Sequence, residues 1–282
     1  MSTGPVEQID GKLSLILPAH NEEPNIEAVV RLAADVLPRY FRDYEVLVVD
    51  DGSKDRTPEL ADALAAENPH VVALHHPKNR GYGGALTTGF TSATGDYLMF
   101  MDSDRQFDIN DIANLVPYIG HYDIVAGYRI KRNDPYYRFL IGSSFNQMVK
   151  LLFQVDLRDI DCGFKVFKAE VLRDMDLTSP GALINTEIHA KANVQGRSVV
   201  EVGVNHYPRL EGEQSGASVR VMAKAIMETF RLWGRMRDYV PPDGNIVVAP
   251  ASARGLVAVG TVGLAGLGTM AFLLSRLVRR RD

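Results

Sequence analysis

The sequence predicts an α/β fold with a mostly parallel central sheet and helices on both of its faces. Short apolar runs alternate with segments of helical spacing through the first half of the chain, the pattern of parallel strands joined by crossover helices. Three of the apolar runs end in acidic or polar clusters. Because parallel strands end at the same edge of a sheet, these clusters are expected to meet in one cleft.

The apolar runs of the first half are short enough to be buried strands. They are Leu13–Leu17, Tyr44–Val49, Val71–Leu74 and Tyr97–Met101. Helices are expected between them over Glu27–Leu37, over Thr57–Glu67, and from the glycine-rich Asn79–Gly84 to about Thr94. Pro18 ends the first strand, and Pro58 lies in the first turn of its helix, where proline is tolerated.

From Asp123 onward the alternation is less regular. Further elements are a strand at Ile124–Ala126, a long helix at Tyr136–Phe153, and strands at Lys165–Phe167 and Val199–Val204. Ser218–Arg237 is amphipathic, with apolar residues three or four apart at Val219, Met222, Ile226, Phe230 and Trp233. Such a helix either packs on the domain or lies in a membrane interface with its cations near lipid phosphates.

The C-terminal part contains a long uncharged stretch. Residues 255–275, between Arg254 and Arg276, are numerous enough to cross a hydrocarbon core of about 30 Å. We therefore expect a membrane-associated, spanning helix, with a buried core helix or an interfacial segment as alternatives. Gly260, Gly263 and Gly266 form a small-residue face that could pack against another helix, including that of a second copy. Basic residues on both sides leave the orientation open.

The chain is accordingly divided into six parts. They are a tail (1–12), the α/β domain (13–217), the amphipathic helix (218–238), a Pro/Ala-rich linker (239–254), the spanning helix (255–275) and a basic tail (276–282).

Composition excludes several classes of protein. The net charge is -4 and no long basic stripe is present, which argues against a nucleic-acid binder. The single cysteine, Cys162, excludes an internal disulfide framework and is expected to be a small buried residue. Residues 1–12 lack a signal-peptide pattern, so we expect the start of the chain to stay on the cytoplasmic side.

The clearest chemical signal is Asp102-Ser103-Asp104, directly after the strand at Tyr97–Met101. Two carboxylates at the end of a buried strand are costly unless a cation compensates them. A divalent cation that bridges carboxylate and phosphate oxygens would do so. The alternative is a capped turn. The two other clusters are Pro18-Ala19-His20-Asn21-Glu22 and Asp50-Asp51-Gly52-Ser53, in which Asp51 is best interpreted as a helix cap.

Together these motifs resemble family 2 glycosyltransferases with the Rossmann-like GT-A fold. Within that family, the chain is similar to the polyprenyl-phosphate branch, which includes dolichol-phosphate mannose synthase. The resemblance covers about Leu13–Phe230. It implies a nucleotide-diphosphate sugar donor (GDP-mannose or UDP-hexose), Mg²⁺ or Mn²⁺, a polyprenyl phosphate acceptor and inversion at the sugar.

The resemblance also implies roles on the donor side of the site. Nucleotide-sugar binding is expected from Pro18, His20, Glu22, Asp50, Asp102, Ser103, Gln106 and Arg209, and metal binding from Asp102, Asp104 and Gln106. His20 stands where the family frequently has Tyr, and Asp50 matches the residue that reads the base. Arg209 belongs to a loop that closes over the diphosphate, where this chain has Ser215-Gly216 in place of the frequent Ser-Lys.

On the acceptor side, Arg129 and Arg138 match positions that hold the acceptor phosphate, as a guanidinium fork suits phosphate. With Asp104 they form the expected catalytic set. Asp161–Lys165 resembles a later loop on the acceptor side, and Glu187 lies in a similar segment without an assigned role. His206 either assists at the closing loop or is an ordinary loop histidine.

The nature of the acceptor can be argued from protonation. A sugar hydroxyl generally needs a base, whereas a phosphate monoester is mostly ionised at neutral pH. The chain lacks the Glu-Asp pair and Gln-x-x-Arg-Trp stretch of processive polysaccharide synthases. We therefore expect transfer to polyprenyl phosphate at the cytoplasmic face of the cell membrane. The alternatives are a transferase with a hydroxyl acceptor, using Asp161 or Glu187 as base, and a nucleotide-sugar-binding scaffold with little activity.

Overall fold

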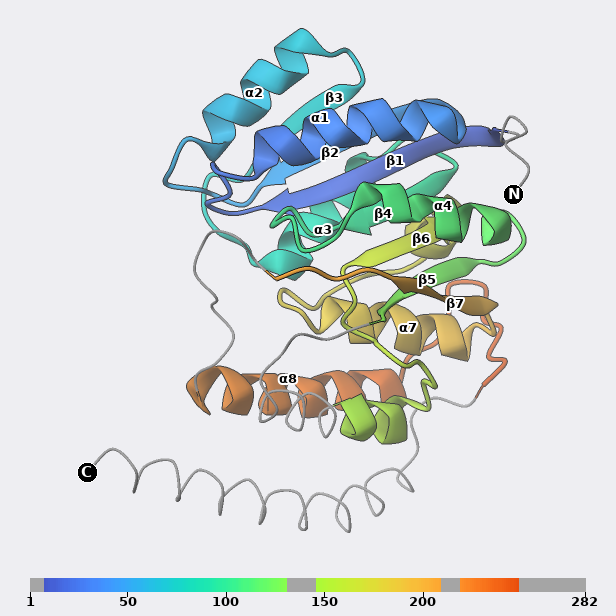
Figure 1. Cartoon of the computed structure of the whole chain (residues 1–282). Helices are drawn as coiled ribbons and strands as arrows, with labels where there is room; N and C mark the ends of the chain where they lie inside the picture. Colours follow the sequence, from blue (N-terminus) through green and yellow to red (C-terminus); the bar gives the residue numbers. More distant parts are fainter. Residues whose placement is uncertain (1–7, 131–145, 209–218, 249–282) are drawn as a thin grey trace.

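The computed structural model describes residues 8–130, 146–208 and 219–248. These residues form one seven-stranded sheet in the order β3-β2-β1-β4-β6-β5-β7, flanked by helices (Figure 1). The strands are β1 (Ile9–Ala19), β2 (Phe41–Asp50), β3 (Val71–His75), β4 (Tyr97–Met101), β5 (Ile124–Arg129), β6 (Phe164–Lys168) and β7 (Val199–Val204).

The sheet is mixed. β1 pairs in parallel with β2 and β4, β2 with β3, and β5 with β7, whereas β6 runs antiparallel to both β4 and β5. The α/β class with helices on both faces is therefore confirmed, and the sheet is parallel in all pairings except those of β6. β6 enters between β4 and β5 from the turn at Cys162 and Gly163, so its N-terminal end meets the carboxyl ends of its neighbours.

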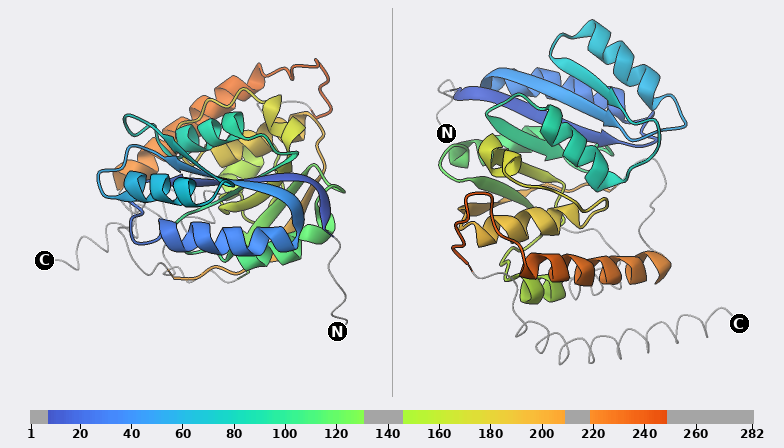
Figure 2. Two further views of the ribbon diagram at one scale, coloured as in Figure 1. Left: turned by 90° about the horizontal axis from the view of Figure 1, so that it is seen from above. Right: turned by 180° about the vertical axis from the view of Figure 1, so that it is seen from behind.

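Helices cover the two faces of the sheet (Figure 2). The helices are α1 (Ile26–Val36), α2 (Thr57–Glu67), α3 (Tyr82–Ser92), α4 (Ile112–Leu115), α6 (Ala169–Arg173), α7 (Ile184–Val194) and α8 (Val219–Arg237), with short 3-10 turns at Leu37–Arg39, Ile109–Asp111 and Val116–Tyr118. Residues 146–153 are also helical, whereas the first part of the helix expected from Tyr136 lies outside the described residues.

Two hydrophobic cores lie on opposite faces of the sheet. Leu13, Leu15 and Leu17 of β1 point into the core shared with α1, α2 and α4, while Ile16 points into the core shared with α3, α6 and α7. This alternation follows from the twofold period of a strand. Because both faces are covered, β1 and β2 consist of nearly continuous buried residues, as their sequences indicate.

α8 occupies the segment in which the sequence predicts an amphipathic helix. Leu232 and Met236 are buried in a third core with α7 and residues 146–153. On the other side, Met227 and Phe230 are exposed. Among the described residues, no helix is long and apolar enough to span a membrane. Residues 255–275 lie outside the described residues, so the spanning helix stays a prediction.

Candidate active site

The three polar clusters lie side by side at the carboxyl edge of β1, β2 and β4. The backbone N–H of Asp51 donates to the carbonyl of Ala19 at 2.8 Å, which ties the end of β2 to that of β1. The hydroxyl of Ser103 donates to the carbonyl of Pro18 at 2.8 Å, which ties the turn after β4 to β1. The convergence expected from the sequence is therefore present, and Pro18 and Ser103 contribute to it as structural partners.

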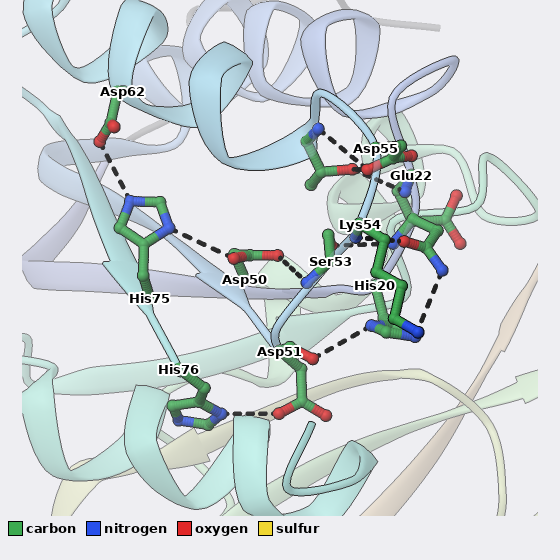
Figure 3. A network of polar contacts seen from close by, with 12 residues as sticks. His20, Glu22, Asp50, Asp51, Ser53, Lys54, Asp55, Asp62, His75 and His76 are labelled. Atoms are coloured by element: carbon green, nitrogen blue, oxygen red, sulfur yellow. Dashed lines mark hydrogen bonds and ion pairs between the residues drawn. The ribbon is translucent and has the colours of Figure 1, made fainter. Parts of the chain in front are cut away.

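The turn after β1 is locked to the turn after β2 (Figure 3). His20 Nδ1 lies 3.0 Å from the carbonyl of Asp51. Asn21, which adopts a φ of 56°, donates its N–H to the hydroxyl oxygen of Ser53, and its side-chain carbonyl accepts from the N–H of Lys54. Glu22 is buried and its carboxylate accepts from the Asn25 amide at 2.7 Å. Nucleotide contacts by His20 and Glu22 stay predictions.

Asp50, His75 and Asp62 form a hydrogen-bonded network that is not predicted from the sequence (Figure 3). The Asp50 carboxylate accepts from the N–H of Ser53 at 3.0 Å and lies 3.4 Å from His75 Nδ1. The other ring nitrogen of His75 lies 3.0 Å from Asp62. Burial alone would lower the pKa of His75, but the hydrogen bonds to Asp62 and Asp50 raise it above its ordinary value. The Asp50 carboxylate, only 3% exposed, is thus held in a fixed orientation.

Asp51 does not have the role of a helix cap that the sequence predicts, because its carboxylate binds the backbone just before α3 and not the first turn of a helix. Its carboxylate oxygens accept from the N–H groups of Arg80 and Gly81 at 2.7 and 2.8 Å. His76 Nδ1 lies 2.7 Å from the same carboxylate. Asp51 therefore fixes the glycine-rich stretch that precedes α3.

Asp102 follows β4 and is enclosed by its neighbours. The hydroxyl of Tyr82 donates to Asp102 Oδ1 at 2.8 Å, and the N–H of Asp102 donates to the carbonyl of Gly163 at 3.1 Å. Burial, followed by the charge of Asp104, raises the pKa of Asp102 to about 7, against the lowering effects of Tyr82, Lys165 and Arg129. A carboxylate whose charge is so poorly compensated is a strong candidate for a cation ligand.

The donor set fits a hard divalent cation. Within residues 8–130, 146–208 and 219–248, no three His, Cys, Asp or Glu side chains gather into a complete metal site. Two carboxylates completed by phosphate oxygens and water are, however, the usual way in which proteins hold Mg²⁺. Asp102 and Asp104 supply such a pair, so the residues present fit Mg²⁺ or Mn²⁺ together with a diphosphate.

Gln106 connects this turn to the segment after β7. Its N–H donates to Asp104 Oδ1 at 3.1 Å, its side-chain amide donates to the carbonyl of Tyr207 at 3.1 Å, and Tyr207 donates back to the carbonyl of Gln106 at 2.8 Å. His206 packs edge-on against Phe107, with ring centroids 5.2 Å apart, in keeping with an ordinary loop histidine. Metal binding by Gln106 stays a prediction.

Arg129, at the end of β5, forms a bidentate ion pair with Asp159. Nε and Nη2 donate to the two carboxylate oxygens at 2.6 and 2.8 Å. Although burial opposes it, the pair raises the pKa of Arg129 above its ordinary value. An acceptor phosphate would therefore share the guanidinium with Asp159. Arg138 and Arg209 lie outside the described residues, and their roles stay predictions.

Lys165 of β6 fixes the loop that precedes this strand. Its ammonium is fully buried and donates to the carbonyls of Ile160, at 3.0 Å, and Cys162. Burial lowers the pKa of Lys165 and raises the pKa of the Cys162 thiol to about 12. Cys162 is thus buried, as expected, and holds its proton firmly at neutral pH.

Two side chains of the site were not assigned a role from the sequence. Tyr82 orients Asp102, and its only signal is the glycine-rich stretch around it. Glu187 is 1% exposed and accepts hydrogen bonds from Thr178, Ser179 and Lys191. Burial opposes ionisation, but these bonds lower the pKa of Glu187 below its ordinary value. A carboxylate in this state is unsuited to act as a general base.

Comparison with known proteins agrees with this geometry. The profile of the family described as "Glycosyl transferase family 2" matches residues 14–176. Among curated proteins, the chain is 34% identical over 236 residues to glycosyltransferase AglD of Haloferax volcanii. The match covers 80% of this chain but 37% of AglD, so the chain spans little more than a third of that relative's length.

Solved structures with the same fold include glucosyl-3-phosphoglycerate synthase from Mycobacterium tuberculosis. Its complex with Mn²⁺, UDP and glucosyl-3-phosphoglycerate has a TM-score of 0.61 at 19% identity, covering 80% of this chain and 81% of that one. Its complex with Mg²⁺ and UDP has a TM-score of 0.58 at 19% identity, covering 78% and 80%. At this identity the likeness establishes the fold. The family match over residues 14–176, on a sheet whose carboxyl edge carries the acidic clusters, shows that this chain belongs to glycosyl transferase family 2.

Proposed function

We propose that this protein transfers one sugar from a nucleotide-diphosphate sugar, GDP-mannose or a UDP-hexose, to a polyprenyl phosphate, with inversion and with Mg²⁺ or Mn²⁺. The observation that carries the donor half of this proposal is the partly buried Asp102 carboxylate, whose pKa is raised by desolvation and by the charge of Asp104, at the carboxyl edge of the sheet. Similar proteins support it, because the mycobacterial synthase was crystallised with Mn²⁺ and UDP-glucose.

Donor binding follows from the fixed side chains of this edge. Asp102 and Asp104 would hold the cation, which when bound neutralises the charge of the leaving nucleoside diphosphate. Asp50, oriented by Ser53 and His75, would accept a hydrogen bond from an N–H of the base ring. Fixing these groups before the donor arrives reduces the entropic cost of binding.

A phosphate acceptor is favoured over a hydroxyl acceptor by the state of Glu187. That carboxylate is buried and saturated with hydrogen bonds, so it is not available to remove a proton from a sugar hydroxyl. Asp161, the other candidate base, is exposed to solvent, and a hydroxyl acceptor that uses it stays the alternative. A phosphate monoester needs no such base, since its second pKa of about 6 leaves it mostly ionised. Arg129 lies near enough to lower the pKa of Asp102, as an acceptor ligand beside the donor should.

We place the reaction at the cytoplasmic face of the cell membrane. The exposed face of α8 supports this location, because Met227 and Phe230 are accompanied by the exposed Arg231. Apolar and basic side chains on one helix suit a surface of anionic lipid. The uncharged residues 255–275 add a second anchor in this proposal.

The test is a transfer assay with the full chain in detergent. Labelled UDP-glucose, UDP-galactose and GDP-mannose are each supplied with Mn²⁺ and either a polyprenyl phosphate or the matching polyprenol, which lacks the phosphate. We expect label in a mild-acid-labile lipid with one donor, only with the phosphate form, and none with Asp104→Asn. Label in polyprenol or in a glycan would instead identify a hydroxyl acceptor. Donor binding without transfer to any acceptor would identify a scaffold.

A further inference from the structure

The glycine-rich stretch before α3, residues Asn79–Gly84, is held from two sides. On one side are the hydrogen bonds from Arg80 and Gly81 to Asp51. On the other side, the N–H of Gly83 donates to the carbonyl of Pro180 at 2.9 Å. The approach is so close that a Cβ on Gly81 or Gly83 would collide with the backbone of residues 179–180. The position of this stretch therefore depends on the position of the 178–180 loop.

Glu187 of α7 fixes that loop. Its carboxylate accepts from the N–H of Ser179 at 2.8 Å and from the N–H and hydroxyl of Thr178 at 3.2 and 3.0 Å. Lys191, one turn further along α7, donates to the same carboxylate at 2.8 Å and also to the carbonyl of Asp176. Hydrogen bonds to a buried charge are the strong ones, and each depends on a carboxylate at this position.

The side chain of Tyr82 connects the glycine-rich stretch to the acidic motif Asp102-Ser103-Asp104. Tyr82 lies between Gly81 and Gly83, the two glycines that touch the 178–180 loop, and its hydroxyl donates to Asp102 Oδ1 at 2.8 Å. A shift of the loop would move the glycine backbone and hence this hydroxyl. A path of direct contacts thus runs from Glu187 through Ser179, Pro180 and Gly83 to Tyr82 and Asp102.

We propose that Glu187 is a positioning residue for the donor site: it holds the 178–180 loop, and through Tyr82 it sets the orientation of the Asp102 carboxylate. This inference rests on the proposed function, in which Asp102 is a ligand of the cation bound with the nucleotide. It also explains why the Glu187 carboxylate of α7 accepts hydrogen bonds from the 178–180 loop and from Lys191, which leave it unsuited to accept a proton.

The experiment measures the affinity of the full chain for Mn²⁺ in the presence of UDP and of GDP, by isothermal titration. The variants are Glu187→Gln and Tyr82→Phe, with Glu170→Gln and Tyr118→Phe as matched controls at exposed positions. We expect both test variants to bind Mn²⁺ about tenfold more weakly, and the controls to bind as the wild type does. Both substitutions act through the Tyr82 hydroxyl. The double variant Glu187→Gln/Tyr82→Phe should therefore bind Mn²⁺ no more weakly than the single variant with the lower affinity.

Hydrogen exchange supplies a readout that needs no metal. In Glu187→Gln, the backbone amides of residues 79–84 should exchange faster, because the Gly83 N–H loses its fixed acceptor at Pro180. If Glu187 has a purely structural role, Glu187→Gln should have a lower melting temperature, but its Mn²⁺ affinity and the exchange of residues 79–84 should equal those of Glu170→Gln. That result would overturn the inference. So would additive losses in the double variant. Where Glu187→Gln does not fold, Thr178→Val is used, with an expected loss of about threefold.

Failure of the inference is separable from failure of the proposed function. If the wild type binds Mn²⁺ with a nucleotide but Glu187→Gln does so equally well, only the positioning role is wrong. If the wild type binds neither the cation nor a nucleotide, the proposed donor site is wrong and the positioning role is wrong with it.

Discussion

Asp102 is the residue whose ionisation should govern cation binding in the proposed donor site. Burial and the charge of Asp104 raise its pKa to about 7, so it is mostly protonated below that pH and mostly ionised above it. A divalent cation binds the ionised form. Mn²⁺ affinity should therefore increase by about tenfold between pH 6 and pH 8, as the ionised fraction rises. Titration calorimetry at several pH values measures this.

The control for this prediction is Asp156→Asn, at a fully exposed carboxylate. It should keep the pH profile of the wild type, whereas Asp102→Asn should bind Mn²⁺ weakly at every pH. A flat profile in the wild type would contradict the assignment of Asp102 as a cation ligand.

His189 is a second buried titratable group, on α7. Burial, with a smaller effect from the charge of Lys165, lowers its pKa well below the ordinary value. Among the described residues, neither of its ring nitrogens has a hydrogen-bond partner. In the unfolded chain His189 takes up a proton near pH 6.5, whereas in the folded protein it stays neutral to a lower pH. His189 should therefore make the folded state less stable as the pH falls below 6.5.

We predict that His189→Leu reduces this acid sensitivity. Between pH 7.5 and pH 5, the variant should lose less unfolding free energy than the wild type does, by about 1 kcal/mol or more. Urea denaturation at the two pH values measures the difference, and His121→Leu, at an exposed histidine, is the matched control. Equal losses in His189→Leu and the wild type would show that His189 is protonated in the folded state.

The acidic motif and its neighbours at the ends of β1 and β2 could be predicted from the sequence, because each polar cluster directly follows an apolar run. Tyr82, His75 and Glu187 could not. Their partners, Asp102, Asp50 and Thr178, come from other elements, and no local spacing encodes those contacts. Residues that orient the site are set by tertiary packing, whereas those at the strand ends are set by local pattern.

At the scale of elements, the turn before β6 is predicted to be intolerant of a side chain. A Cβ on Gly163 would collide with the carboxylate of Asp102, and the carbonyl of Gly163 accepts from the Asp102 N–H. Gly163→Ala should therefore displace the carboxylate and weaken Mn²⁺ binding by about tenfold or more, with a loss of about 1–3 kcal/mol in unfolding free energy.

Gly234→Ala in α8 is the matched substitution. A Cβ there meets nothing within 4 Å, so the change should stabilise the helix by up to about 1 kcal/mol and leave Mn²⁺ binding unaltered. Calorimetry and thermal unfolding of both variants test the pair. Normal Mn²⁺ affinity in Gly163→Ala would contradict the close packing of this turn against Asp102.

The strands were the most predictable elements and α7 the least. β4 and β7 have the expected bounds, Tyr97–Met101 and Val199–Val204, because buried apolar runs bounded by polar residues leave little ambiguity. α7 has no apolar stripe: it buries Asn185, Glu187 and Lys191 along with its apolar residues. Its polar side chains serve internal hydrogen bonds, so hydrophobic periodicity gives no sign of a buried helix there.

At the scale of the whole molecule, the class of the fold followed from the alternation of elements, while the direction of β6 did not. A strand's sequence carries little information on the direction of its neighbours, and β6 is buried like the parallel strands beside it. Its reversal brings the turn at Gly163 beneath Asp102, on the same edge as the ends of β1 and β2. The site is thus assembled from both halves of the chain, and the three polar clusters that predict it by following apolar runs all lie in the first half.

The most direct measurement is the titration of UDP and of GDP into the full chain, with Mn²⁺ and again with EDTA, in the wild type, Asp102→Asn and Asp104→Asn. One of the nucleotides should bind the wild type in Mn²⁺, and about tenfold or more weakly with EDTA or in either variant. Nucleotide binding of equal strength in all these conditions, or binding of neither nucleotide in Mn²⁺, would contradict the claim that the acidic edge of this sheet grips a cation and a diphosphate.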